Sequence, residues 1–172
     1  MTRQMTGAKM VVQALKDQGV DTVFGYPGGA VLPIYDEVFQ QNDIKHVLVR
    51  HEQGAVHAAE GYARSTGKPG VVLVTSGPGA TNASIGVHVA MQDSQPMILF
   101  VGDVDSEMRD REGFQEVDFA AFFGPIAKWA ARIDSADRIP EYVARAYAMA
   151  VSGRPGPVVL ALPEGMLGRD PG

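Results

Sequence analysis

Glu52 is the side chain best placed for acid–base chemistry, because it stands where an expected strand at 46–49 meets an expected helix at 52–65. Taken alone, it could be a first-turn carboxylate that the helix dipole favours by ~0.3–1 kcal/mol. The helix behind it, however, has almost no side-chain bulk and would bury little surface by itself. We therefore expect another helix or backbone to approach it closely over its small residues, which are Gly54, Ala55, Ala58, Ala59, Gly61 and Ala63.

A second slim helix is expected at 80–91, where Ala83, Gly86 and Ala90 are its small residues. Two glycine-rich segments, 25–29 and 76–79, accompany the two slim helices. Small residues allow a close approach of backbones, as at a tight subunit contact. The combination indicates a dimer interface with a site built into it.

Three other patterns that could carry chemistry each depart from their motif. The segment from Gly77 to Asn82 fits the dinucleotide-binding pattern G-x-G-x-x-G except at its last position, and Pro78 removes a backbone donor. Ser76 stands at a strand-to-helix turn, but the hydrolase pattern G-x-S-x-G requires glycine where the chain has Val74. The four histidines lack metal-ligand spacing, so we expect no metal site within this chain. A nucleotide-binding α/β domain stays open as an alternative.

The alternation of strands and helices predicts the fold that must position these residues. Strands such as 71–75 and 157–162 are apolar on both faces, which is typical of a parallel sheet covered by helices on both sides. We predict an α/β fold: a three-layer, doubly wound parallel sheet of about six strands. Ligands bind at the carboxyl ends of such strands, so the loops of interest are 25–29, 50–52, 76–82 and 102–115. The expected strands are 22–24, 46–49, 71–75, 97–101, 127–131 and 157–162, and the expected helices are 6–18, 30–40, 52–65, 80–91, 118–123 and 135–151.

Composition excludes several classes of function. The 172 residues include 15 Lys and Arg against 20 Asp and Glu, for a net charge of −5, which disfavours binding to nucleic acid or to an anionic membrane. The longest apolar runs, such as 97–101, are far shorter than the roughly 20 residues of a membrane-spanning helix. There is no cysteine and no visible export signal, so we expect a cytoplasmic protein.

Four motifs form an ordered series along the chain. They are Gly25-Tyr26-Pro27-Gly28-Gly29-Ala30; Arg50-His51-Glu52-Gln53-Gly54-Ala55 with Ala59-Glu60-Gly61-Tyr62-Ala63-Arg64; Thr75-Ser76-Gly77-Pro78-Gly79-Ala80-Thr81-Asn82; and Phe114-Gln115-Glu116. Together they resemble the N-terminal, pyrimidine-binding domain of thiamine diphosphate enzymes, specifically the acetolactate (acetohydroxyacid) synthase branch. The resemblance covers residues 6–167 and implies the thiamine diphosphate-binding fold.

The resemblance implies a catalytic role for Glu52. In these enzymes the corresponding glutamate bonds to N1′ of the cofactor's aminopyrimidine and shares a proton with it, which helps to form the reactive ylid. Burial among small and apolar residues disfavours the charged form of a carboxyl, as such a proton relay requires. Glutamine could not cycle a proton there, and aspartate would be one methylene short.

The other motif residues would surround the same cofactor. By resemblance, five residues bind the pyrimidine side together with Glu52: Tyr26, Pro27, Gly28, Pro78 and Asn82. Asn82 could instead cap a helix turn. Phe114 and Gln115 resemble the pair that faces the reacting end of the cofactor and the substrate, and their alternative is an ordinary pair of loop residues.

The loop at 103–113 is far more charged than the resemblance leads us to expect, because seven of its residues carry a formal charge: Asp103, Asp105, Glu107, Arg109, Asp110, Arg111 and Glu112. The substrate therefore stays open within the cofactor class. The main interpretation is acetolactate synthase-like decarboxylation and ligation of 2-keto acids. The alternatives are a thiamine diphosphate-dependent decarboxylase, lyase or acyltransferase with another substrate, or a catalytically silent cofactor-binding module.

The chain lacks the family's diphosphate motif, which is Gly-Asp-Gly followed by an asparagine some two dozen residues on. Gly102 and Asp103 precede Val104, and the only asparagines are Asn42 and Asn82. We therefore expect one domain over 1–172, with residues 165–172 leaving toward a missing middle domain, and an isolated domain without activity. Mg²⁺ would be bound by a domain absent here. The resemblance implies two partners, a second copy in a homodimer or tetramer and a C-terminal diphosphate-binding domain, and leaves FAD binding in the full-length protein open.

Overall fold

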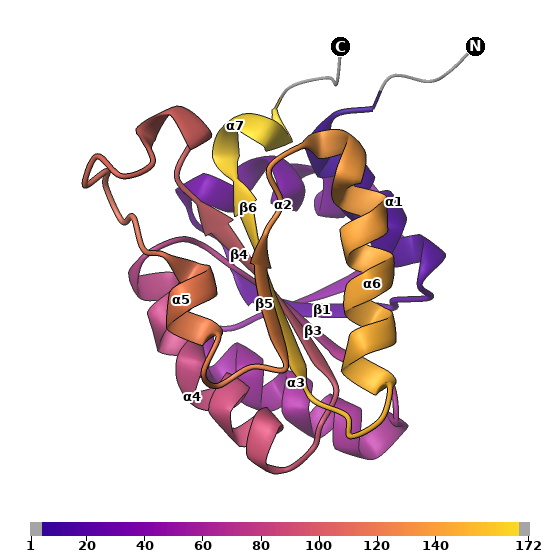
Figure 1. The fold of residues 1–172 in the computed structure, drawn as a ribbon. Coiled ribbons are helices and arrows are strands. Elements are labelled where there is room, and N and C mark those ends of the chain that lie inside the picture. The colour runs from indigo at the N-terminus through magenta and orange to yellow at the C-terminus, as the bar shows by residue number, and fades with distance from the viewer. Residues whose placement is uncertain (1–4, 169–172) are drawn as a thin grey trace.

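The fold is a parallel sheet with helices packed on both of its faces. A computed structural model describes residues 5–168, and Figure 1 shows the arrangement of their elements. The six strands lie in the order β2-β1-β3-β4-β6-β5, and every neighbouring pair is parallel. This confirms the predicted α/β class. The strands are β1 (Thr22–Tyr26), β2 (Lys45–Leu48), β3 (Gly70–Val74), β4 (Met97–Asp103), β5 (Trp129–Arg132) and β6 (Pro157–Pro163).

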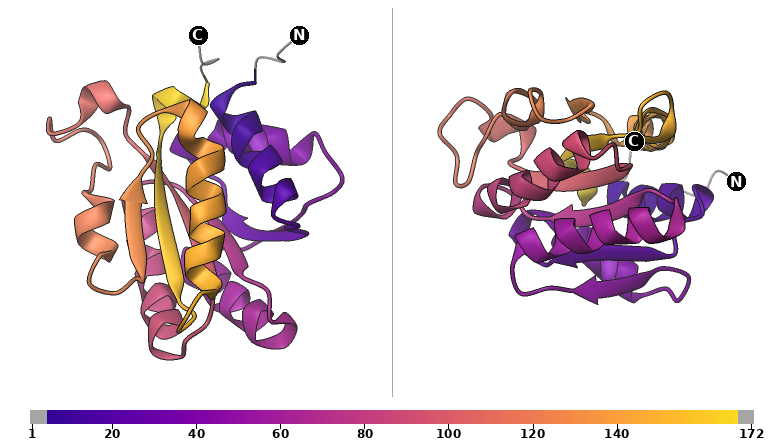
Figure 2. Two further views of the ribbon diagram at one scale, coloured as in Figure 1. Left: turned by 45° about the vertical axis from the view of Figure 1, so that its right-hand side comes forward. Right: turned by 90° about the horizontal axis from the view of Figure 1, so that it is seen from below.

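The helices fall into two groups, each covering one face of the sheet. One buried cluster joins α1 (Gly7–Asp17), α2 (Leu32–Phe39), α6 (Ile139–Val151) and α7 (Glu164–Leu167) to the sheet. The other joins α3 (Glu52–Thr66), α4 (Pro78–Gln92) and α5 (Phe119–Phe123) to the opposite face. Alternate residues of the central strands enter the two clusters, as Val71 and Val72 do, because successive strand side chains point to opposite faces. The layers are visible in Figure 2.

Local signals in the sequence set several helix ends. The Thr6 hydroxyl accepts a hydrogen bond from the Lys9 N–H (3.3 Å) and so caps α1, while Gly19 follows the helix with φ +73°. The helix expected at 30–40 begins instead as a 3₁₀ turn, Gly29–Val31, before α2 continues it with Pro33 in its first turn. The helix expected at 135–151 likewise starts as a 3₁₀ turn, Ala136–Arg138.

The end of the described chain packs against its beginning. The expected exit segment at 165–172 starts inside α7, whose Leu167 is fully buried, and residues 169–172 lie outside the described residues. A Cβ on Gly7 would lie 2.4 Å from the Met166 carbonyl oxygen, so α1 and α7 are in direct contact. Both helices are therefore part of the packed fold. Within 5–168, no helix combines the length and apolar character needed to cross a bilayer.

The strand order places a topological switch point between β1 and β3. The chain leaves β1 toward the edge strand β2 and then crosses back to β3 on the other side of β1. The loops that follow β1 and β3 therefore run in opposite directions at the carboxyl ends of adjacent strands. Ligands of doubly wound sheets bind at such a switch point. The segments after β1, β2 and β3, which carry Gly28, Glu52 and Ser76, converge on this edge of the sheet.

Candidate functional site

Glu52 lies buried at this edge, in the first turn of α3. The chain enters α3 through His51, whose Nδ1 accepts a hydrogen bond from the Gln53 N–H (3.1 Å). Glu52 itself is only 7% exposed. The Asn82 side-chain amide, from α4, donates to its Oε2 (3.0 Å), while Oε1 has no hydrogen-bond partner among residues 5–168. One carboxylate oxygen is thus held in place and the other is available to a ligand.

Two glycines allow the segments after β1 and β3 to pack closely against Thr75, and one of them also lies near the carboxylate. A Cβ on Gly28 would lie 2.5 Å from the Cβ of Thr75, and a Cβ on Gly79 would lie 2.7 Å from the Thr75 Cγ2. The Gly79 position is also 3.4 Å from Glu52 Oε1. Larger residues at either position would require the loops to separate. These segments are therefore tightly packed at both glycines.

Two residues behind Glu52 have roles that the sequence did not reveal. The buried Tyr35 hydroxyl, from α2, donates to the Leu73 carbonyl oxygen (2.8 Å). Burial, and then the nearby charge of Glu52, raise the pKa of this hydroxyl, so it stays a donor. The Thr75 Oγ1 is buried with no hydrogen-bond partner in the described part of the chain. Thr75 belongs to a motif noted above, but only the folded chain shows that its hydroxyl is buried without a partner between two glycines.

Gln115 reaches the same edge from the loop after β4. The Ser76 hydroxyl donates to the Gln115 Oε1 (3.1 Å), and a Cβ on Gly77 would lie 2.6 Å from the Gln115 Cβ. Gly77 has φ +53°, a backbone conformation that is strained for residues with a side chain. Glycine is therefore required both for this conformation and for the close contact with Gln115. Ser76 therefore holds the loop that carries Gln115, and its oxygen is not arranged as a nucleophile.

The remaining predicted site residues are exposed or partly buried in the segments that follow β1, β3 and β4. Tyr26 ends β1 and is 41% exposed, and Pro27 follows it partly buried. Pro78 is exposed in the first turn of α4. Phe114 is 87% exposed and so has few neighbours within this chain. The structure thus brings Glu52, Asn82, Gly28 and the Gln115 loop together, and leaves Phe114 apart.

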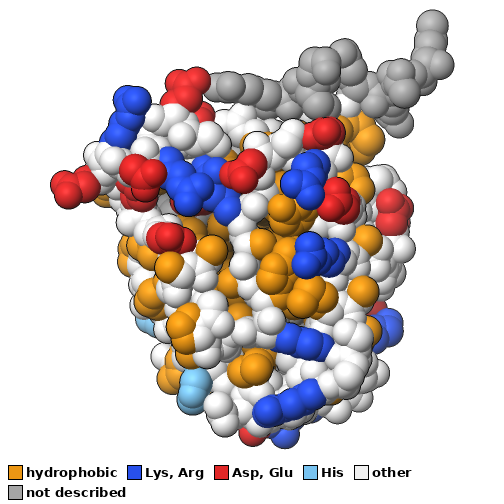
Figure 3. All heavy atoms as spheres, in the orientation of Figure 1, with side chains coloured by type: hydrophobic (Ala, Val, Ile, Leu, Met, Phe, Trp, Pro, Cys, Tyr) orange, Lys and Arg blue, Asp and Glu red, His pale blue; other side chains and the backbone are white. Residues whose placement is uncertain are grey.

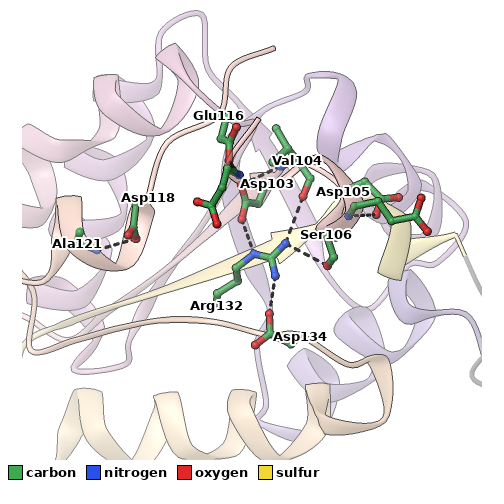
Figure 4. A network of polar contacts seen from close by, with 11 residues as sticks. Asp103, Val104, Asp105, Ser106, Glu116, Asp118, Ala121, Arg132 and Asp134 are labelled. Carbon is green, nitrogen blue, oxygen red and sulfur yellow. Dashed lines mark hydrogen bonds and ion pairs between the residues drawn. The ribbon is translucent and has the colours of Figure 1, made fainter. Parts of the chain in front are cut away.

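The charged loop after β4 is held at its start by a buried ion pair. Arg132 of β5 bonds to Asp103 at the end of β4 (2.8 Å), to the Ser106 hydroxyl (3.2 Å) and to Asp134, as Figure 4 shows. A hollow of about 630 Å³ lies beside this network, and Gln115 lines it as well as contacting Ser76. The same loop forms the protrusion at the upper left of Figure 3, where acidic and basic side chains alternate.

Some small residues of α3 and α4 allow these helices to pack against each other, and others lie on an open surface. A Cβ on Gly86 of α4 would lie 2.2 Å from the Val56 Cγ2 of α3, so these helices need glycine at their crossing. By contrast, a Cβ on Gly61 would have nothing within 4 Å. Part of the expected subunit contact is therefore an internal helix pair. The glycine at position 61 is not explained by contacts among residues 5–168.

No set of three or more His, Asp and Glu side chains is arranged to hold a metal ion within 5–168. Asp103, which follows Gly102 as in the start of the diphosphate motif, instead bonds to Arg132 and to the Val104 N–H (2.8 Å). Its carboxylate therefore stabilises the fold at this position.

Comparison with known proteins adds a family to this geometry. The family described as "Thiamine pyrophosphate enzyme, N-terminal TPP binding domain" matches residues 5–122. Acetolactate synthase large subunits are similar, with 52% identity over 162 residues in Haemophilus influenzae and 51% over 166 residues in Buchnera aphidicola. Isozyme 3 of Escherichia coli is 51% identical over 163 residues. These alignments cover 94–96% of this chain and 28–29% of each relative.

Proposed function

Because the chain belongs to the thiamine pyrophosphate enzymes, by their N-terminal TPP-binding domain, we propose that it forms the pyrimidine side of an enzyme that decarboxylates and ligates 2-keto acids. About 50% identity to acetolactate synthase large subunits supports this reaction class. The chain spans under a third of the length of these relatives, so the rest of the site would come from elsewhere. We propose that a second copy of the chain and a diphosphate-binding domain that holds Mg²⁺ supply it. We also propose that the enzyme is cytoplasmic.

One observation carries the proposal: a buried carboxylate lies at the switch point of the sheet with one oxygen held and one available. Glu52 Oε1, unpaired among residues 5–168, suits a flat ring that hydrogen-bonds through its edge, as an aminopyrimidine does. Gly28 and Gly79 both pack against the Thr75 side chain, which holds the segments after β1 and β3 close together, and Gly79 also lies near Glu52 Oε1.

Each residue of the chain then has a defined task. Thiamine diphosphate, when bound, supplies an electron sink for the loss of carbon dioxide from a 2-keto acid. Glu52 Oε1 would hold and move a proton at the ring nitrogen that it faces, while Asn82 fixes Oε2 and so orients the carboxyl group. The residues that would surround the ring and exclude water from it are Tyr26, Pro27, Gly28 and Pro78. Phe114 and Gln115 would face the reacting end and the substrate.

Replacing Glu52 by glutamine in the complete enzyme tests the proposal. Glutamine keeps the size and the bond to Asn82 but cannot exchange a proton, so turnover should fall by about 10²–10⁴-fold. Glu37→Gln is the matched control, because Glu37 lies on α2 in a long pair with Lys9 (3.9 Å), and it should leave turnover unchanged. An unchanged rate in Glu52→Gln would contradict the catalytic role and favour a silent cofactor-binding module.

The charge of the loop at 103–113 favours one alternative within the same class, a different 2-keto acid or acyl acceptor. Product analysis of the complete enzyme with pyruvate separates the two readings. Acetolactate as the main product would support the synthase, and turnover only with another 2-keto acid would support the alternative. A decarboxylase or lyase would release an aldehyde or cleave its substrate instead of forming acetolactate. Whether FAD is bound would be read from the absorbance of the same preparation.

A further inference from the structure

We propose that Glu116 is a positioning residue that shapes the loop 104–117 and so places Gln115 against Ser76 and Gly77. The inference rests on the proposed function, because it assigns Gln115 to the substrate side of that site. Glu116 itself has no hydrogen bond to Glu52, Asn82 or Ser76 among the described residues. Glu116 would act on the site through Gln115, the residue that precedes it in the chain.

The Glu116 carboxylate ties three parts of the loop together. The Asp110 N–H donates to Oε1 (2.6 Å) and the Gly113 N–H donates to Oε2 (2.8 Å). The Glu116 N–H in turn donates to the Gly113 carbonyl oxygen (3.0 Å). These backbone donors, Gly113 first and then Asp110, lower the pKa of Glu116, so the carboxylate is charged when it holds them.

The loop needs such ties because its backbone is otherwise unfavourable. Asp110 (φ +61°), Glu112 (φ +53°) and Gln115 (φ +63°) all adopt the left-handed conformation that side chains disfavour. A conformation of this kind persists only when its surroundings hold it, and it recurs at functional sites. The bond between Asp110 and Glu116 spans all three of these residues, and Gln115 directly precedes Glu116 in the chain.

Both ends of the loop are anchored to the sheet. At its start, Arg132 bonds to Asp103, to the Val104 carbonyl oxygen (3.4 Å) and to the Ser106 hydroxyl, as seen in Figure 4. At its end, Gln115 accepts from Ser76 and packs against Gly77. Between these two contacts, the Glu116 carboxylate holds the backbone of the loop through the Asp110 and Gly113 N–H groups.

The test is Glu116→Gln in the complete enzyme. Glutamine has one acceptor oxygen and would turn an N–H toward the second backbone donor, so one of the two ties is lost. We expect the KM for the 2-keto acid to rise about fivefold or more while kcat changes by less than about twofold, as displaced substrate contacts predict. Amide hydrogen exchange at Asp110 and Gly113 should accelerate about tenfold or more, because both N–H groups lose a held acceptor.

Glu107→Gln is the matched control, since Glu107 is an exposed carboxylate of the same loop with no side-chain hydrogen bond among the described residues. It should leave both KM and exchange unchanged. A double variant with Gln115→Ala tests the route: the effect of Glu116→Gln on KM should vanish when Gln115 is already absent. Additive effects would overturn the inference, as would a lowered melting temperature with unchanged KM, which would indicate a purely structural role.

The two proposals fail separately. Unchanged turnover in Glu52→Gln contradicts the proposed function, whereas the exchange rates of Asp110 and Gly113 still report on the loop. If Glu52→Gln abolishes turnover and Glu116→Gln changes neither KM nor exchange, the function stands and only the role of Glu116 is overturned.

Discussion

At the scale of single residues, Glu52 and Asn82 show how a site is built from few contacts. Asn82 donates to one carboxylate oxygen, and Gly79 lies near the other. A carboxyl group held by one oxygen keeps its orientation without losing the second oxygen to the protein. This arrangement resembles the support that positioned catalytic groups receive from neighbouring hydrogen bonds.

His46 is a partly buried polar residue outside the candidate site. Its ring packs edge-on against Tyr35 (5.0 Å between centroids) and Phe39 (5.7 Å), and its Nε2 is buried with no hydrogen-bond partner in residues 5–168. Burial lowers its pKa below the ordinary value of 6.5. The folded chain therefore disfavours the charged imidazole more than the unfolded chain does.

This difference predicts an acid-sensitive stability. As the pH falls below about 6.5, the unfolded chain binds the proton first, so the free energy of unfolding decreases toward acid. His46→Gln should reduce that slope, by at most the value for one proton, about 1.4 kcal/mol per pH unit. Urea unfolding of the 172-residue chain between about pH 7.5 and 5 measures it. His88→Gln, at an exposed position, is the control, and equal slopes in wild type and His46→Gln would refute the prediction.

At the scale of elements, the two slim helices contain two kinds of glycine. Gly86 is required by the crossing of α4 with α3, where Val56 fills the space that a Cβ would occupy. Gly61, on α3, faces open space and has no such requirement within the chain. Glycine in a helix interior costs about 1 kcal/mol relative to alanine, so its presence at an open position needs another reason. A second copy packing on this face would supply one.

Alanine substitutions separate these two kinds of glycine. Gly86→Ala should destabilise the chain by about 1–3 kcal/mol, because the new methyl group overlaps Val56 and α3 must move. Gly61→Ala should stabilise it by up to about 1 kcal/mol, since alanine favours the helix and meets no neighbour. Chemical denaturation of both variants gives the comparison. A Gly86→Ala chain as stable as wild type would contradict the packing described here.

At the scale of the whole molecule, we propose that the candidate site is one part of a larger one. This edge of the sheet would provide a carboxylate, an amide and closely packed backbone for a ring. A diphosphate needs basic groups or a metal ion as well, and Asp103, which begins a partial diphosphate motif, is already bound to Arg132. Leu48, at the end of β2, and Ile85, on α4, are exposed apolar side chains on which a partner could pack.

The isolated chain should therefore bind thiamine diphosphate weakly or not at all. Without the diphosphate contacts, ring binding alone should give a dissociation constant no better than about 1 mM, the affinity of a few weak contacts. Calorimetric titration with Mg²⁺ present measures it, with the complete enzyme as the positive control. Micromolar binding by this chain alone would contradict the proposal that a second domain supplies the rest of the site.

The amino-acid sequence by itself determined the order of the elements and the place of Glu52 between a strand and a helix. Strands that are apolar on both faces, such as β3 and β6, are recognisable because burial of both faces leaves no alternation. Helix ends at Thr6 and Gly19 follow from capping and backbone chemistry within a few residues. Glu52 could be placed at a strand-to-helix junction on the same local grounds.

The tertiary structure alone decided which distant residues meet. Asn82 bonds to Glu52 across 30 positions and Ser76 bonds to Gln115 across 39, and both contacts depend on the order in which strands join the sheet. The internal pairing of α3 with α4 and the bonds of Glu116 also follow from that order or from loop geometry. Local sequence patterns indicate which face of a helix or strand is buried. The order of the strands in the sheet decides which other elements that face contacts.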